Sequence, residues 1–258
     1  MDVTTALQQT RQHFRRLDLT LPPALLKELD EVDAVLSKRT TAGISSDTLV
    51  TSAWNALAAG RDLVADKAVT GALMAGMLAQ QNLGFRLGEY ADRLRAEAFT
   101  RHAEDVLNEM AGIVTSADET LAAAHAVITD LDLTSPSAVT AIAPKYASVW
   151  AHAREAAIRL DSVGQVWVYV VAACRLAPIP HDQRGRSLIF LDVDLDELDA
   201  LPLVPHSPAS WTTAVAHSGH RLDYAMPQEV TERCRRIEQQ RAELAQRAEE
   251  KQKAGFSR

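Results

Sequence analysis

The chain has 258 residues, of which 47% are hydrophobic and 24% charged, as in a folded globular protein of one large or two small domains. Its formal net charge of −7 at pH 7 argues against a general nucleic-acid coat, and we expect no nucleic-acid partner. The N-terminal residues contain no apolar signal segment. The most apolar stretch, residues 68–79, is too short to span a bilayer, which needs ~20 residues. We therefore expect no membrane contact and a cytoplasmic location, or one within a virion-type assembly.

Two compositional features add to this. Only six of the 27 basic residues are Lys, which suggests a GC-rich genome such as that of an actinobacterium or one of its phages. The two cysteines, Cys174 and Cys234, lie far apart in the chain, and we expect two free thiols rather than a structural disulfide.

Apolar residues at helical spacing predict a succession of helices through the first two-thirds of the chain. One helix begins near Val3, and another follows the residues LTLPP. A third carries a stripe of large apolar residues that we expect to face inward: Val50, Trp54, Leu57 and Val64. The scattered glycines predict a break near residues 80–84, and we expect one long helix from there to about Ile113.

Further along, Ser116 with Glu119 forms a capping-box pattern that predicts the start of the next helix. Pro144 opens another, in which Trp150 and Leu160 face inward. Short connections between successive helices favour antiparallel neighbours. We therefore expect an antiparallel helical bundle over residues 1–161.

Two interpretations stay open after Gly164. Residues 166–176 are rich in β-branched and aromatic side chains, and residues 186–194 form a second apolar run beyond a loop containing Pro and Gly. The two runs predict either a β-hairpin or, for residues 166–176, a last bundle helix, since periodicity does not separate these at such a length. We therefore expect an all-α fold or, if the β-hairpin forms, a mainly-α fold. In either case residues 162–224 form a less regular module.

The third predicted domain, residues 225–258, is a projecting charged helix. Four acid–base pairs fall at i,i+4 with the acid first, which is the favourable order: Glu229–Arg233, Glu232–Arg236, Glu243–Arg247 and Glu249–Lys253. A narrow apolar seam runs along the helix, and we expect it to bind a protein partner or a second copy through Val230, Cys234, Ile237 and Leu244. Two apolar heptads are too few for a strong isolated coiled coil.

An acidic cluster follows the apolar run at residues 188–191. Its carboxylates at alternate positions, Asp192, Asp194 and Asp196, are candidate ligands for a divalent cation, with His206 as an additional candidate. The opposing interpretation is that Asp194 or Asp196 caps a short helix, with acidic residues in its first turn.

The sequence carries no motif for nucleotide binding or nucleophilic catalysis, and we expect no cofactor. It predicts a non-catalytic helical interaction or assembly protein, such as a structural accessory of a phage or mobile element. The alternative is a metal-dependent enzyme or small-molecule binder that uses the acidic cluster.

Overall fold

The computed structural model describes residues 2–37, 46–80, 83–203 and 210–255. It is mainly helical, and the described residues contain no strand. They form two compact units, Ala24–Phe99, which we call the hairpin unit, and Met1–Pro23 with Thr100–Arg258, which we call the core unit. These units group the chain differently from domains 1–161, 162–224 and 225–258, which stay predictions.

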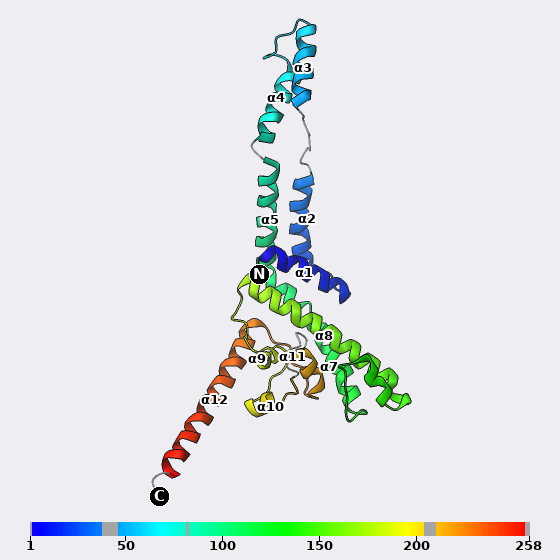
Figure 1. Ribbon diagram of the computed structural model, residues 1–258, viewed down its shortest axis with the longest axis vertical. Coiled ribbons are helices and arrows are strands. Elements are labelled where there is room, and N and C mark those ends of the chain that lie inside the picture. Colours follow the sequence, from blue (N-terminus) through cyan, green and yellow to red (C-terminus); the bar gives the residue numbers. More distant parts are fainter. Residues whose placement is uncertain (1, 38–45, 81–82, 204–209, 256–258) are drawn as a thin grey trace. The chain divides into compact units, whose positions relative to one another are not determined.

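The core unit is built around one long helix, α8 (Ala147–Cys174) (Figure 1). Four other helices pack against it: α1 (Val3–Arg16), α6 (Ala103–Asn108), α7 (Ala111–His125) and α11 (Ser210–His217). The second half of α8 is buried on several sides, since Val163, Val166, Trp167, Val170 and Val171 are all fully inaccessible. A helix covered in this way needs apolar residues around its circumference.

That burial explains the continuous apolar run after Gly164. Residues 166–174 belong to α8, so the helix interpretation is confirmed for them and the β-hairpin is not. The second run begins in the last turn of the short helix α9 (Gln183–Ser187), and from Leu188 it has neither helix nor strand until α10 (Leu195–Asp199) begins. The backbone N–H groups of Asp223 and Ala225 donate to the Phe190 and Ile189 carbonyls, at 2.8 and 2.9 Å, which holds this segment without a sheet.

Among the described residues, one segment is long and apolar enough to cross a bilayer by length and composition, namely Pro144–Cys174. Helices pack along it, and 44% of its most apolar window is buried within the protein. The central helix of a folded core meets the same criteria.

The prediction of one long helix from residue 83 to about Ile113 is wrong, because this stretch forms α5 (Leu83–Arg101), α6 and the beginning of α7. Between α5 and α6, His102 leaves the helical region with φ −101° and ψ 16°. The predicted start at Ser116 is wrong as well. It lies inside α7, where its carbonyl accepts a hydrogen bond from the Thr120 hydroxyl at 2.8 Å.

Aromatic packing joins the C-terminal part of the core unit to α8. Gly164 leaves room for Trp211 of α11, because a Cβ atom at residue 164 would lie 2.6 Å from the Trp211 ring. The Trp211 ring stacks on Phe190 with centroids 5.6 Å apart. From α8 itself, the Trp167 indole N–H donates to the Ala225 carbonyl at 3.0 Å. The absence of a side chain at Gly164 is therefore a packing requirement.

The hairpin unit contains α2 (Pro23–Ser37), α3 (Ser46–Ala58), α4 (Lys67–Gln80) and most of α5 (Figure 1). The predicted break near residues 80–84 agrees with the end of α4 at Gln80 and the start of α5 at Leu83. Arg95 of α5 joins α2 through the Asp33 carboxylate, at 2.5 Å. The helices α3 and α4 pack against each other, and we call this pair the α3–α4 hairpin.

The connection within the α3–α4 hairpin is locally well formed. Gly60, two residues after the end of α3, adopts a left-handed φ of 64°, and the Arg61 N–H donates to the Ala56 carbonyl at 2.9 Å. At the start of α4, the Asp66 carboxylate accepts from the backbone N–H groups of Ala68 and Val69 at 2.8 and 3.1 Å. It also pairs with Arg61 at 2.5 Å. These bonds lower the pKa of Asp66, with the Val69 N–H as the largest cause.

The prediction that the apolar stripe of the third helix faces inward is wrong. The four residues of this stripe are between 59% and 82% exposed: Val50, Trp54, Leu57 and Val64. The buried positions of α3 and α4 are instead Ala56, Val69 and Ala72. The face of α3 that is turned away from solvent is thus shifted by one residue from the predicted face.

Candidate interaction surfaces

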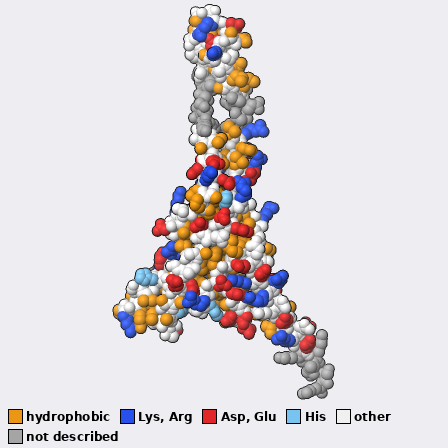
Figure 2. Space-filling view, turned by 180° about the vertical axis from the view of Figure 1, so that it is seen from behind, with side chains coloured by type: hydrophobic (Ala, Val, Ile, Leu, Met, Phe, Trp, Pro, Cys, Tyr) orange, Lys and Arg blue, Asp and Glu red, His pale blue; other side chains and the backbone are white. Residues whose placement is uncertain are grey.

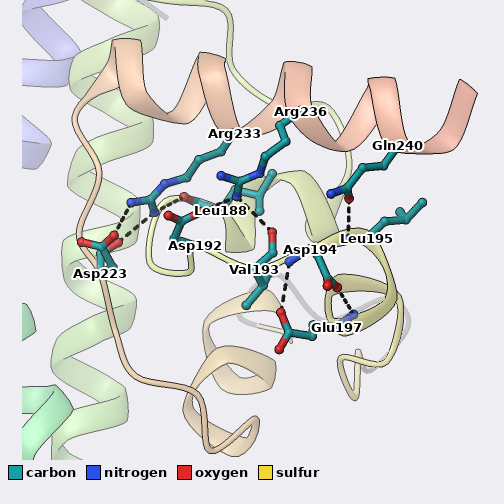
Figure 3. A network of polar contacts seen from close by, with 10 residues as sticks. All are labelled: Leu188, Asp192, Val193, Asp194, Leu195, Glu197, Asp223, Arg233, Arg236 and Gln240. Atoms are coloured by element: carbon teal, nitrogen blue, oxygen red, sulfur yellow. Dashed lines mark hydrogen bonds and ion pairs between the residues drawn. The ribbon is translucent and has the colours of Figure 1, made fainter. Parts of the chain in front are cut away.

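The C-terminal helix α12 (Pro227–Gly255) is anchored at its beginning by Arg233 (Figure 3). This guanidinium is 8% exposed and donates to the carbonyls of Leu188 and Asp223 at 3.0 and 2.9 Å, and to the Asp223 carboxylate at 2.6 Å. Each bond joins α12 to the segments before it. A buried cation with this many acceptors positions the first turns of the helix.

One turn further along, Arg236 donates to the Asp192 carboxylate and to the Val193 carbonyl, the latter at 3.1 Å (Figure 3). The hydrogen bond from Arg236 is the main cause that lowers the pKa of Asp192. After another turn, the Gln240 side-chain oxygen accepts the Leu195 N–H at 2.8 Å. The acidic segment is therefore the surface on which α12 rests.

Three acidic residues of this segment, Asp194, Glu197 and Asp199, have local partners as well. Asp194 is the N-cap of α10 and accepts the Glu197 N–H at 3.0 Å, while the Glu197 carboxylate accepts the Asp194 N–H at 3.1 Å. This capping box confirms the expected cap. Asp199 lies 3.5 Å from Arg184 and 3.6 Å from Arg241. Asp196 lies in the first turn of α10 and is exposed.

Nothing in the described part of the chain gathers three or more His, Cys, Asp or Glu side chains as a metal site would. The candidate ligands Asp192 and Asp194 are committed to Arg236 and to the cap of α10, and His206 lies outside the described residues. The metal-dependent alternative therefore gains no support from this geometry.

The predicted partner-binding seam of α12 divides into two parts. Val230 and Ile237 are 1% and 3% exposed, buried within the core unit, and Cys234 is half-buried beside them. Leu244 is 49% exposed, and every side chain from Arg241 to Glu250 is exposed. The surface that is left for a partner is the distal part of α12, from Arg241 onward.

The expected ion pairs of α12 follow the same division. Arg233 and Arg236 bind Asp223 and Asp192 rather than the glutamates four residues before them. Glu229 instead accepts the Met226 N–H at 2.7 Å at the start of the helix. In the distal part, Glu243 and Arg247 do pair, at 3.7 Å.

A surface hollow of about 450 Å³ lies between the beginning of α12 and the segment from Pro178 to Gly185. Cys234, Ile237 and Arg241 line one side, and Ile179 and His181 line the other. Burial raises the pKa of the Cys234 thiol, and the charges of Glu238 and Asp182 raise it further. A protonated thiol is a poor nucleophile, so this environment does not activate Cys234 for covalent chemistry.

Two histidines of the core unit are packing elements. The imidazole of His217 accepts the Leu133 N–H at its Nε2 atom, 2.8 Å away, which requires the neutral ring. Burial lowers the pKa of His217 and favours this form. The His125 ring, whose Nε2 lies 2.9 Å from the Ala216 carbonyl, is a donor there. Together they join α11 to α7 and to the turn that follows it.

The α3–α4 hairpin presents a different kind of surface. The exposed face of α3 carries Val50, Trp54 and Leu57, and that of α4 carries three further large residues, Leu73, Met74 and Met77, at 48% to 62% exposure. The other three tryptophans are at most 5% exposed, in contrast to 72% for Trp54. Figure 2 shows hydrophobic side chains at the surface of this unit. Sequence reasoning identified this stripe on α3 but assigned it to the core.

No protein-family model, curated protein or solved structure matches the chain. The kind of protein is therefore described from its own fold and surfaces. It is a mainly helical protein with a buried central helix, an anchored C-terminal helix and an exposed apolar helical hairpin.

Proposed function

We propose that this is a non-catalytic interaction or assembly protein whose main docking surface is the α3–α4 hairpin. The observation that carries the proposal is the placement of residues in the hairpin. Its buried positions are small or β-branched, while Trp54, Met74 and Met77 are more than half exposed. Large exposed apolar surfaces mark contact sites for other molecules, and Trp and Met are common in such sites.

The distal part of α12 is a second proposed contact. It carries one exposed large apolar residue, Leu244, between the charged side chains of Glu243 and Arg247. A truncation after Gln240 removes this surface and keeps Arg233 and Arg236 in place. We expect that truncation to keep the melting temperature and to lose any association that depends on α12.

The hairpin proposal is tested by replacing its large exposed residues with polar ones. In Trp54→Ser/Met74→Ser/Met77→Ser, we expect unchanged helical content, loss of binding of an apolar fluorescent dye, and loss of association with partners. The matched control is Ile158→Ser on α8, which is 49% exposed outside the hairpin. Unfolding of the triple variant under conditions where the control folds would show that these residues form an internal core, and the proposal would fail.

The antiparallel bundle over residues 1–161, the phage or mobile-element setting and the cytoplasmic location remain predictions from the sequence. Use of the acidic cluster by an enzyme is the weaker alternative, because Asp192 is already engaged by Arg236 and Asp194 by the cap of α10.

A further inference from the structure

The helix α3 has an inner face and an exposed face, and the residues of the two faces have the same spacing, offset by one position in the sequence. On the inner face Ala56 is buried and Leu49 and Ala53 are half-buried, whereas Val50, Trp54 and Leu57 are exposed. On α4 the buried residues are Val69 and Ala72. The hairpin therefore closes on itself mainly through small side chains, which let the two helices approach, and leaves its large ones free.

The amount of exposed surface fits a protein contact. The six large residues of the two exposed faces are 48% to 72% exposed. At that exposure they offer roughly 700 Å² of apolar surface, close to the ~800 Å² that each partner contributes to a standard interface. They are Val50, Trp54, Leu57, Leu73, Met74 and Met77. A stable dimer needs about this much from each copy.

The charge pattern selects the kind of partner. Residues 48–60 and 68–85 contain no charged side chain, and the charges of the hairpin lie beyond their ends, as at Arg61, Asp62, Lys67 and Arg86. A face without charge offers nothing to a basic or acidic peptide or to nucleic acid. Two copies of such a face meet without opposing like charges.

The backbone of α4 also permits a close approach. Gly71 is exposed three residues before Met74, and no atom lies within 4 Å of the position that its Cβ would take. An open glycine on a helix surface lets another helix approach closely. A second helix therefore meets no steric obstacle at this position beside Met74.

A lipid bilayer fits this surface less well. The 14 residues of α4 extend about 21 Å, which is shorter than the ~30 Å hydrocarbon core. The connection after α3 carries charged residues of both signs, with Arg61 paired to Asp66. Interfacial helices favour a basic polar face, and this chain has a net charge of −7.

From these observations we infer that the α3–α4 hairpin docks against the α3–α4 hairpin of a second copy of this chain. The contact is a homotypic four-helix arrangement with Trp54, Met74 and Met77 at its centre. A two-fold axis covers the same face on both copies at once, which is the commonest way in which soluble chains pair. The inference rests on the proposed function and names the partner of that surface.

The test is the solution mass of the full chain, measured by light scattering and sedimentation over a wide range of protein concentration. We expect the wild type to change from monomer to dimer as its concentration rises. Trp54→Ser/Met74→Ser should raise the dimer dissociation constant by at least about tenfold. Leu73→Lys, a single change at a residue 48% exposed, should have the same effect by placing like charges opposite each other. The control Ile158→Ser should dimerise like the wild type.

Three results would overturn the inference: a wild type that stays monomeric throughout, a dimer that survives both hairpin variants, or a control that dissociates equally. If the wild type is monomeric and its Trp54 emission shifts to the blue with neutral phosphatidylcholine vesicles, the occupant is lipid. In that case the inference of a homotypic dimer is wrong, while the proposal that the α3–α4 hairpin is a docking surface is supported. If Trp54 is shielded from a quencher in the monomer, the proposed function itself fails.

Discussion

The helix α8 and the α3–α4 hairpin both contain long apolar stretches, yet they place their large side chains in opposite environments. In α8, Trp167 and Val170 are fully buried under neighbouring helices. In α3 and α4, Trp54 and Met74 are 72% and 62% exposed, and the buried positions include Ala56 and Ala72. An apolar pattern therefore identifies side chains whose removal from water is favourable, but it does not identify the molecule that covers them.

The largest expected effect contrasts two tryptophans. Trp211→Ala should cost about 3–5 kcal/mol of unfolding free energy, since Trp211 is 2% exposed and stacks on Phe190. Trp54→Ala should stay within about 0.5 kcal/mol in the monomer, because its ring is exposed. Urea unfolding of both variants at low protein concentration measures the difference. Equal losses would remove the distinction between the two regions.

A second contrast uses the same substitution in both regions. Gly164→Ala should destabilise the core unit by about 1–3 kcal/mol, because the new methyl group would lie 2.6 Å from the Trp211 ring. Gly71→Ala meets open space and should stabilise α4 by about 0.5–1 kcal/mol. Thermal unfolding should therefore move in opposite directions, and a loss in both variants would contradict the assignment of Gly71 to an open face.

A third contrast concerns two arginine–aspartate pairs. Arg233→Met should cost about 1–3 kcal/mol, because the Leu188 and Asp223 carbonyls lose a donor at a buried site. Arg61→Met should cost less than about 1 kcal/mol, because Arg61 is largely exposed and Asp66 keeps two backbone donors. Chemical denaturation of the two variants gives the comparison. A larger loss at Arg61 would show that the connection in the hairpin is held more tightly than the anchor of α12.

The smallest effect is a pH dependence that belongs to the core unit. Burial lowers the pKa of His13 and His217, and nearby Arg16 lowers that of His13 further. The unfolded chain then binds more protons than the folded one, so stability should fall as the pH drops below about 6.5. His217→Gln keeps an acceptor for the Leu133 N–H and does not titrate. Its unfolding free energy should change less between pH 7.5 and 5.5 than that of the wild type, and an equal change would exclude His217 as a contributor.

The sequence predicts local structure well where the signal is local. The charged pattern after Pro227 is a helix, Asp194 is a cap, and α4 ends where glycines weaken the pattern. The number of helices between residues 83 and 125 was not readable, because apolar spacing continues across the turn at His102. A run of β-branched residues such as 166–174 is equally suited to a strand and to a helix buried on several sides.

The candidate site was harder to predict because its geometry depends on distant partners. Arg233 and Arg236 have suitable glutamates four residues before them, yet they bind Asp223 and Asp192, brought near by the folded core unit. On α3, the stripes starting at Leu49 and at Val50 have the same period. Hydrophobicity favours burial of the stripe that starts at Val50, because its side chains are larger. In the structure the stripe that starts at Leu49 is the less exposed one, next to the small buried residues of α4. No local signal chooses between the two.

The most direct test of the central claim is acrylamide quenching of tryptophan fluorescence in dilute, monomeric protein. Trp54 is the exposed member of the four tryptophans, since Trp150, Trp167 and Trp211 are at most 5% exposed. We predict one readily quenched component, which disappears in Trp54→Phe and becomes protected when the docking partner binds. A wild type without that component, or one in which Trp54→Phe leaves it unchanged, would contradict an exposed apolar hairpin and the interaction function proposed for it.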